Sequence, residues 1–248
     1  MRLSVLNNAT AMLHGMQALV ALGLVSWLET EPRQNLLFNG GQFKLIKVAP
    51  VWHKDRIEGE LIDSGRINVC YIVVAFFALS TIFQGIIAGQ LLPDHARLVR
   101  FAEYGVSASI MMMAIALEAG IRDVYTLECV FALTCATQIF GALAEMHMGQ
   151  KSKTWLVPHT AGWLTFLCAY GPVLDILLQS GSPPDPIFWL VVVQFGLFCC
   201  FGAVQAYGGL VADDARCDAA YIILSFVSKT SLGWMIIGPI LADAVAMT

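Results

Sequence analysis

The chain has 248 residues, of which 58% are hydrophobic and 13% charged, and its net charge is -4. Soluble domains usually carry about 25% charged residues, so this composition excludes an ordinary soluble domain and indicates an apolar solvent around most of the chain. No run of Lys and Arg is dense enough for nucleic acid. The seven cysteines show no metal-ligand spacing, and we expect them to pack as small hydrophobes.

Seven stretches are long and apolar enough to cross a bilayer, whose hydrocarbon core of roughly 30 Å takes about 20 residues per helix. In chain order the helices are predicted at about 4–28, 67–92, 96–118, 122–146, 154–179, 185–210 and 217–243. The first stretch is too long for a signal peptide and is taken as the first span. The sequence therefore predicts an all-α membrane protein: a single seven-transmembrane-helix bundle over residues 1–248, embedded in the lipid bilayer.

One connection is long, over residues 29–66. Within it the strand-like runs 36–38 and 43–48 flank Asn39-Gly40-Gly41, and Asn-Gly between such runs is a strong hairpin signal. We expect a small β-hairpin on the membrane surface, with an irregular loop as the alternative.

The distribution of Lys and Arg in the loops predicts the orientation, because cytoplasmic loops are richer in these residues. Six lie on the side of the N-terminus: Arg2, Arg97, Arg100, Lys151, Lys153 and Arg216. The other side has Arg122 and six more within 29–66, a segment that we discount because part of it folds as a unit of its own. On that choice the N-terminus is cytoplasmic and the C-terminus extracellular.

Two charged residues lie deep inside the predicted membrane spans. Lys229 is twelve residues into the last helix and Glu103 seven residues into the third, so at about 1.5 Å per residue they lie roughly 18 and 10 Å deep from the same side. A charge near the bilayer centre costs at least about 2.5–3.5 kcal/mol, and such residues are usually functional. A lysine side chain spans most of the difference in depth, so we expect a Lys–Glu pair.

Three interpretations of this pair compete. It is a structural ion pair, or part of an ion-coupled transporter or receptor without a cofactor, or the attachment site of retinal. The chemistry suits the third, because a desolvated lysine becomes a nucleophile toward an aldehyde and a nearby carboxylate keeps the resulting imine protonated. Ser225 lies one turn before Lys229 and either caps a helix carbonyl or contacts the imine.

Seven helices with one lysine in the middle of the seventh resemble the microbial rhodopsin superfamily. The segment 100–109, Arg-Phe-Ala-Glu-Tyr-Gly-Val-Ser-Ala-Ser, is similar to the third-helix signature of heliorhodopsins, whose glutamate (here Glu103) is the Schiff-base counterion. Ser225 stands where pumps usually carry an aspartate, and the long 29–66 connection is similar to the family's extracellular hairpin. The resemblance implies all-trans retinal on Lys229, a cytoplasmic N-terminus and a homodimer.

The resemblance also implies further site residues. His14 and Ser80 match positions near the Schiff base, whereas Gln84 stands where the family often has a histidine and cannot accept a proton as histidine does. The remaining retinal-pocket candidates, for which ordinary helix packing is the alternative, are Ser107, Met112, Trp163, Phe198, Phe201 and Gln205. Four ionisable residues near helix ends are expected to be solvated at the interface: Glu118, Glu145, His147 and Asp175.

The functional expectation is a light-sensing retinal protein in the plasma membrane that signals to an unknown partner and is not an enzyme. One carboxylate beside the imine argues against an efficient pump. Two alternatives stay open. One is a light-gated or light-driven ion transporter of the same fold, with Gln84, Asn68 and Gln138 along its path, and the other is a seven-helix receptor or transporter without retinal.

Overall fold

The computed structural model describes residues 3–30, 41–52, 57–89, 96–148, 153–179, 181, 183–211 and 214–246. This part of the chain contains seven helices that are long and apolar enough to cross a membrane. They are α1 (Leu3–Leu28), α3 (Val69–Ala88), α4 (Ala96–Glu118), α5 (Val124–His147), α6 (Leu156–Gln179), α7 (Asp185–Val211) and α8 (Asp214–Ala246). The predicted seven-helix fold is confirmed, and the chain is an integral multi-pass membrane protein.

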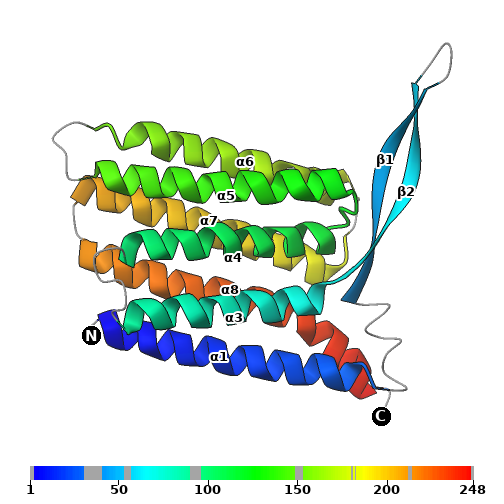
Figure 1. Cartoon of the computed structure of the whole chain (residues 1–248), viewed down its shortest axis with the longest axis horizontal. Helices are drawn as coiled ribbons and strands as arrows, with labels where there is room; N and C mark the ends of the chain where they lie inside the picture. The colour runs from blue at the N-terminus through cyan, green and yellow to red at the C-terminus, as the bar shows by residue number, and fades with distance from the viewer. Residues whose placement is uncertain are drawn as a thin grey trace.

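The helices run side by side as one bundle, with the start of α1 and the end of α8 at opposite ends (Figure 1). Neighbours in sequence are mostly neighbours in space: α1 packs on α3, α3 on α4, α4 on α5, and α5 on α6. The last helix, α8, packs on α7 and closes the bundle against α1 and α3. Of the seven, α4 is the most deeply buried, so the helix that carries Glu103 lies at the centre.

Two of the helices, α3 and α5, begin just after a residue whose side chain caps the first turn. Asn68 Oδ1 accepts a hydrogen bond from the backbone N–H of Cys70 (2.9 Å), and Asp123 Oδ2 accepts from that of Thr126 (2.8 Å); such caps satisfy free N–H groups of a first turn. The second membrane helix therefore begins at Val69 rather than 67. It ends at Ala88 rather than 92, with Gly89 as its C-cap.

The hairpin between the first two membrane helices is present, but its pairing differs from the prediction. Strands β1 (Gln42–Trp52) and β2 (Ile57–Asn68) are antiparallel, with Phe43 opposite Ile67 and Val48 opposite Leu61. Residues 43–48 are thus part of a strand, but their partner is β2, which follows them in the chain. The predicted Asn39-Gly40 turn and the run 36–38 lie outside the described residues. The partner of 43–48 is a long strand, with which β1 pairs along Gln42–Trp52 with one register shift.

The hairpin projects beyond the end of the bundle where α8 ends (Figure 1), and β1 is attached to the α4–α5 connection. The N–H of Ile46 donates to the carbonyl of Arg122 (3.0 Å), and the Arg122 guanidinium lies 3.9 Å from the centroid of the Phe43 ring. The register shifts between Lys44 and Ile46, which turns this stretch of β1 toward the helices. The backbone hydrogen bond and the cation–π contact therefore hold the hairpin on the bundle.

The part of β2 around Asp63 and Gly65 has polar contacts of its own. Asp63 accepts a hydrogen bond from the N–H of Gly65 (3.0 Å) and pairs with Lys44 (3.1 Å). These two interactions lower the pKa of Asp63. Gly65 has a φ of 103°, a left-handed conformation that favours glycine.

Candidate functional site

The two charged residues of the predicted spans meet in the core of the bundle. Lys229 Nζ on α8 lies 2.8 Å from Glu103 Oε1 on α4, and the two side chains are 3% and 1% exposed. Removing both charges from water is costly, and the cost is met only where the geometry is good and further hydrogen bonds satisfy the pair.

Two serines supply those further hydrogen bonds. Ser80 Oγ on α3 donates to Glu103 Oε1 (2.7 Å), and Lys229 Nζ donates to Ser225 Oγ (2.7 Å). Ser225 therefore contacts the lysine amine itself, one of the two roles that the sequence left open for it. The Tyr104 ring centroid lies 5.2 Å from Lys229 Nζ, which adds a cation–π contact on a further side of the amine.

Lys229 opens onto a cavity between α4, α5, α6, α7 and α8, which we call the main cavity, with an empty volume of about 900 Å³ that includes open solvent. Eight of the sequence-predicted residues line it: Ser107, Met112, Trp163, Phe198, Phe201, Gln205, Ser225 and Lys229. The sequence had assigned these residues separately, on four helices, and in the structure they line one cavity.

The other predicted residues lie beside this cavity. Glu103 and Ser80 stand behind Lys229, on the side of a second cavity that Glu103 shares with Gln84, Asn7 and Arg100. His14 is fully buried, and its ring packs between those of Phe77 and Phe226 at centroid distances of 5.7 and 5.3 Å.

Sequence reasoning missed His159, which lines the main cavity together with Thr134, Thr137, Gln138 and Gly141. The Trp163 indole Nε1 donates to His159 Nε2 (3.1 Å), and His159 Nδ1 lies 2.9 Å from Gln205 Oε1. A signal for this residue was available, because His159 precedes the predicted pocket residue Trp163 by four positions and so shares its helix face.

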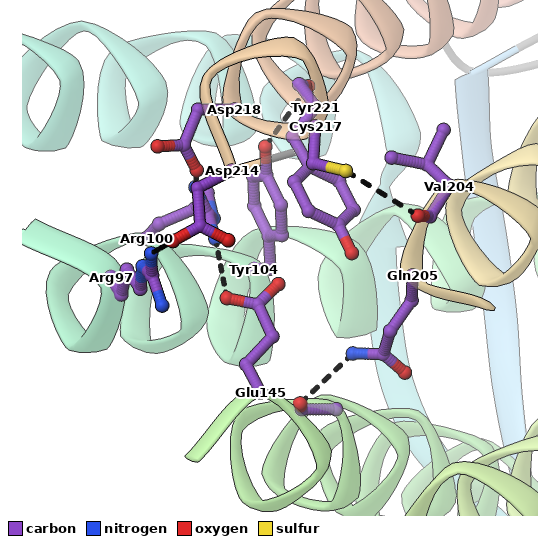
Figure 2. Close-up of polar contacts among 11 residues, drawn as sticks. Arg97, Arg100, Tyr104, Glu145, Val204, Gln205, Asp214, Cys217, Asp218 and Tyr221 are labelled. Carbon is purple, nitrogen blue, oxygen red and sulfur yellow. Dashed lines mark hydrogen bonds and ion pairs between the residues drawn. The ribbon is translucent and has the colours of Figure 1, made fainter. Parts of the chain in front are cut away.

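The expectation that Glu145 is solvated at the interface is wrong. Arg100 bonds through its guanidinium to Glu145 Oε2 (2.8 Å) and to Asp218 Oδ1 (2.5 Å), and the Arg100 and Glu145 side chains are each only 10% exposed. Figure 2 shows these groups converging from α4, α5 and α8. A buried guanidinium is stable only when it is paired with opposite charge, and Arg100 has two carboxylate partners. Of the other three residues, Asp175 is exposed, and Glu118 and His147 are half-buried.

Three ion pairs connect α4 and α8, and we refer to them as the α4–α8 charge ladder. They are Arg97–Asp214, Arg100–Asp218 and Glu103–Lys229. Between the second and third, the Tyr104 hydroxyl donates to the carbonyl of Tyr221 (3.1 Å). The ladder thus runs from the exposed Arg97–Asp214 pair at the helix ends to the buried lysine.

The residues present fit a long, apolar aldehyde. One end of the cavity holds an amine beside a carboxylate, and the walls carry Met111, Met112, Phe166 and Phe198. Ser107 Oγ is buried in this wall without a hydrogen-bond partner among the described residues.

The comparisons with known proteins agree with this fit. A family model described as heliorhodopsin matches residues 3–241, a range that contains every residue of the site. No curated protein matches the chain.

Proposed function

Because the chain belongs to the heliorhodopsin family of retinal-binding microbial rhodopsins, we propose that it is a light sensor that signals rather than pumps. Its all-trans retinal is bound to Lys229 as a protonated Schiff base, with Glu103 as the counterion. The observation that carries this proposal is the buried Lys229–Glu103 pair at 2.8 Å on the wall of the cavity.

Retinal, when bound, supplies the absorption of visible light and the double bonds that isomerise. The chain's own residues set the charge at its attachment point. Glu103 favours a proton on Lys229 Nζ, because an opposite charge within hydrogen-bond distance stabilises the charged form. Ser80 holds the Glu103 oxygen, and Ser225 holds the nitrogen toward α4, so a change at the nitrogen acts on three helices.

The residues around the lysine support signalling over pumping. A vectorial proton pump needs an acceptor and a donor on opposite sides of the nitrogen. Among the described residues that line the main cavity, none is Asp or Glu, and Ser225 takes the position one turn before Lys229. Glu103 is therefore the one carboxylate that we assign to the nitrogen.

A light-gated or light-driven ion transporter is the second candidate, and the second cavity favours it. Ser4, Asn7, Gln84 and Arg97 line that cavity together with Glu103, so polar groups lead from the α1 end toward the counterion. The path expected from the sequence is not formed as a unit, since Gln138 lines the main cavity and Asn68 caps α3.

We place the protein in the plasma membrane as a homodimer, with the N-terminus in the cytoplasm and the hairpin and C-terminus outside. The signalling partner then binds at the cytoplasmic end, where the α4–α8 charge ladder begins.

Two measurements on retinal-loaded protein test the proposal. We expect a visible band that hydroxylamine removes and that an Lys229→Ala variant lacks, and we expect no steady photocurrent in a voltage-clamped cell. A sizeable steady current would favour the transporter. A colourless protein would favour a receptor or transporter without retinal.

A further inference from the structure

Among the apolar residues of the main cavity, one group of polar side chains lies on α6 and α7. Lys229 belongs to α8, which packs on α1, α3 and α7, whereas α6 packs on α5 and α7. In that group, His159 and Trp163 of α6 meet Gln205 of α7, and all three line the cavity. We refer to these three residues as the ring-end trio, because a retinoid attached at Lys229 would direct its ring toward them.

The hydrogen bonds of the ring-end trio determine which ring nitrogen of His159 carries the proton. An indole N–H can only donate, so His159 Nε2, which lies 3.1 Å from Trp163 Nε1, is an acceptor. The histidine proton is therefore on Nδ1, which donates to Gln205 Oε1 (2.9 Å). Gln205 Nε2 in turn donates to the carbonyl of Gly141 on α5 (2.9 Å), which fixes the orientation of the amide.

This arrangement leaves unused hydrogen-bonding capacity on one residue. Both ring nitrogens of His159 and the single donor of Trp163 are engaged within the trio. An amide has two donor hydrogens and two acceptor lone pairs, and the contacts of Gln205 with His159 and Gly141 use one of each. Gln205 is only 8% exposed, so one buried hydrogen and one buried lone pair remain on a residue of the cavity wall.

Two glycines make room for the trio. A Cβ at position 202 would lie 2.4 Å from Cζ2 of Trp163, and a Cβ at position 141 would lie 2.8 Å from the Phe101 ring and 3.4 Å from Gln205 Nε2. Larger residues at either position would push the indole or the amide out of place. The ring-end trio therefore depends on residues of α5, α6 and α7 together.

We propose that the ring-end trio is a recognition site for a retinoid whose ring carries a hydroxyl group, with Gln205 as the residue that determines this specificity. A hydroxyl both donates and accepts one hydrogen bond, which matches the capacity left on Gln205. A ring without a hydroxyl group can form no hydrogen bond with the Gln205 amide. This inference rests on the proposed function, because it assumes that a retinoid occupies the cavity.

The test uses two ligands that cannot form an imine, all-trans-retinol and its 4-hydroxylated form, so that neither light absorption nor attachment contributes. Their affinities for the full-length apoprotein are measured by quenching of tryptophan fluorescence. We expect the wild type to bind the hydroxylated ligand at least as tightly as retinol. In Gln205→Met we expect the hydroxylated ligand to lose at least about fivefold relative to retinol, the value of one net hydrogen bond.

Phe198→Leu is the matched control, since Phe198 lines the same cavity with an apolar side chain; it should change both affinities in parallel. A wild type that binds the hydroxylated ligand more weakly than retinol overturns the inference without any variant, as does a ratio that Gln205→Met leaves unchanged. All-trans-retinal is added to the same preparation. If a visible band forms but either of these two affinity results is obtained, this inference alone is overturned. If no visible band forms, the proposed function is overturned as well.

Discussion

At the scale of single residues, the central feature is a pair of buried charges that each need the other. Lys229 and Glu103 are almost fully buried and 2.8 Å apart, and Ser80 and Ser225 bind one partner each. Depth along two predicted helices was enough to expect this pair from the sequence. The sequence could not choose between two roles for Ser225, because that choice depends on its side-chain rotamer.

Replacing Glu103 with Gln tests the counterion directly. Without the carboxylate the protonated nitrogen loses its stabilising charge, so we expect the visible absorption to shift and the protonated form to be lost at a pH about 1–3 units lower than in the wild type. A pH titration of the absorption spectrum measures this. An unchanged spectrum and an unchanged titration would show that Glu103 is not the counterion.

Ser80→Ala removes the hydrogen bond that α3 gives to Glu103. Hydrogen bonds to charged groups contribute about 1.5–3 kcal/mol, so we expect a smaller change in the same titration. Thr81→Val is the matched control, because the Thr81 hydroxyl donates to the carbonyl of Phe77 in its own helix (2.9 Å). Equal effects of the two variants would mean that Ser80 does not act through Glu103.

At the scale of elements, apolar length predicted which segments are helices, but not how they are rotated. The Arg100–Glu145 pair was missed for this reason, since its members lie on α4 and α5 and face each other only in the folded bundle. The hairpin shows a second limit. Its strand 43–48 was recognised, yet its pairing with β2 was not, because a local turn signal carries no information about a strand further along the chain.

The α4–α8 charge ladder predicts a graded stability effect. In Asp218→Asn the buried Arg100 keeps Glu145 but loses its second partner, and we expect a loss of about 1–2 kcal/mol. In Asp214→Asn the loss should stay below about 0.5 kcal/mol, because that pair is exposed and surface pairs contribute little. Thermal unfolding in detergent compares the two, and a larger effect of Asp214→Asn would contradict the ladder.

The attachment of the hairpin to the bundle can be tested by Phe43→Ala. This change removes the ring under Arg122, a contact worth about 0.5–1 kcal/mol at exposed sites. We expect faster hydrogen exchange at the Ile46 amide, which donates to Arg122. Leu61→Ala is the control, since Leu61 is 67% exposed on β2. Exchange that is unchanged in Phe43→Ala would mean that the backbone contact alone holds the strand.

At the scale of the whole molecule, the buried pair, the charge ladder and the hairpin attachment follow one helix through the membrane bundle. The central helix α4 carries Glu103 and the arginines of the ladder at one end and leads to the hairpin attachment at the other. The family match over residues 3–241 establishes a retinal-binding rhodopsin. The main cavity, which both the Lys229 amine and the ring-end trio line, explains how this chain would hold such a ligand.

The most direct test of the account is to identify which lysine carries the chromophore. Retinal-loaded protein is treated with borohydride, which reduces an imine to a stable secondary amine, and the peptides are mapped by mass spectrometry. We predict a retinyl group on the peptide that contains Lys229. A retinyl group on another lysine, or on none, would contradict the assignment of Lys229 and with it the role of Glu103.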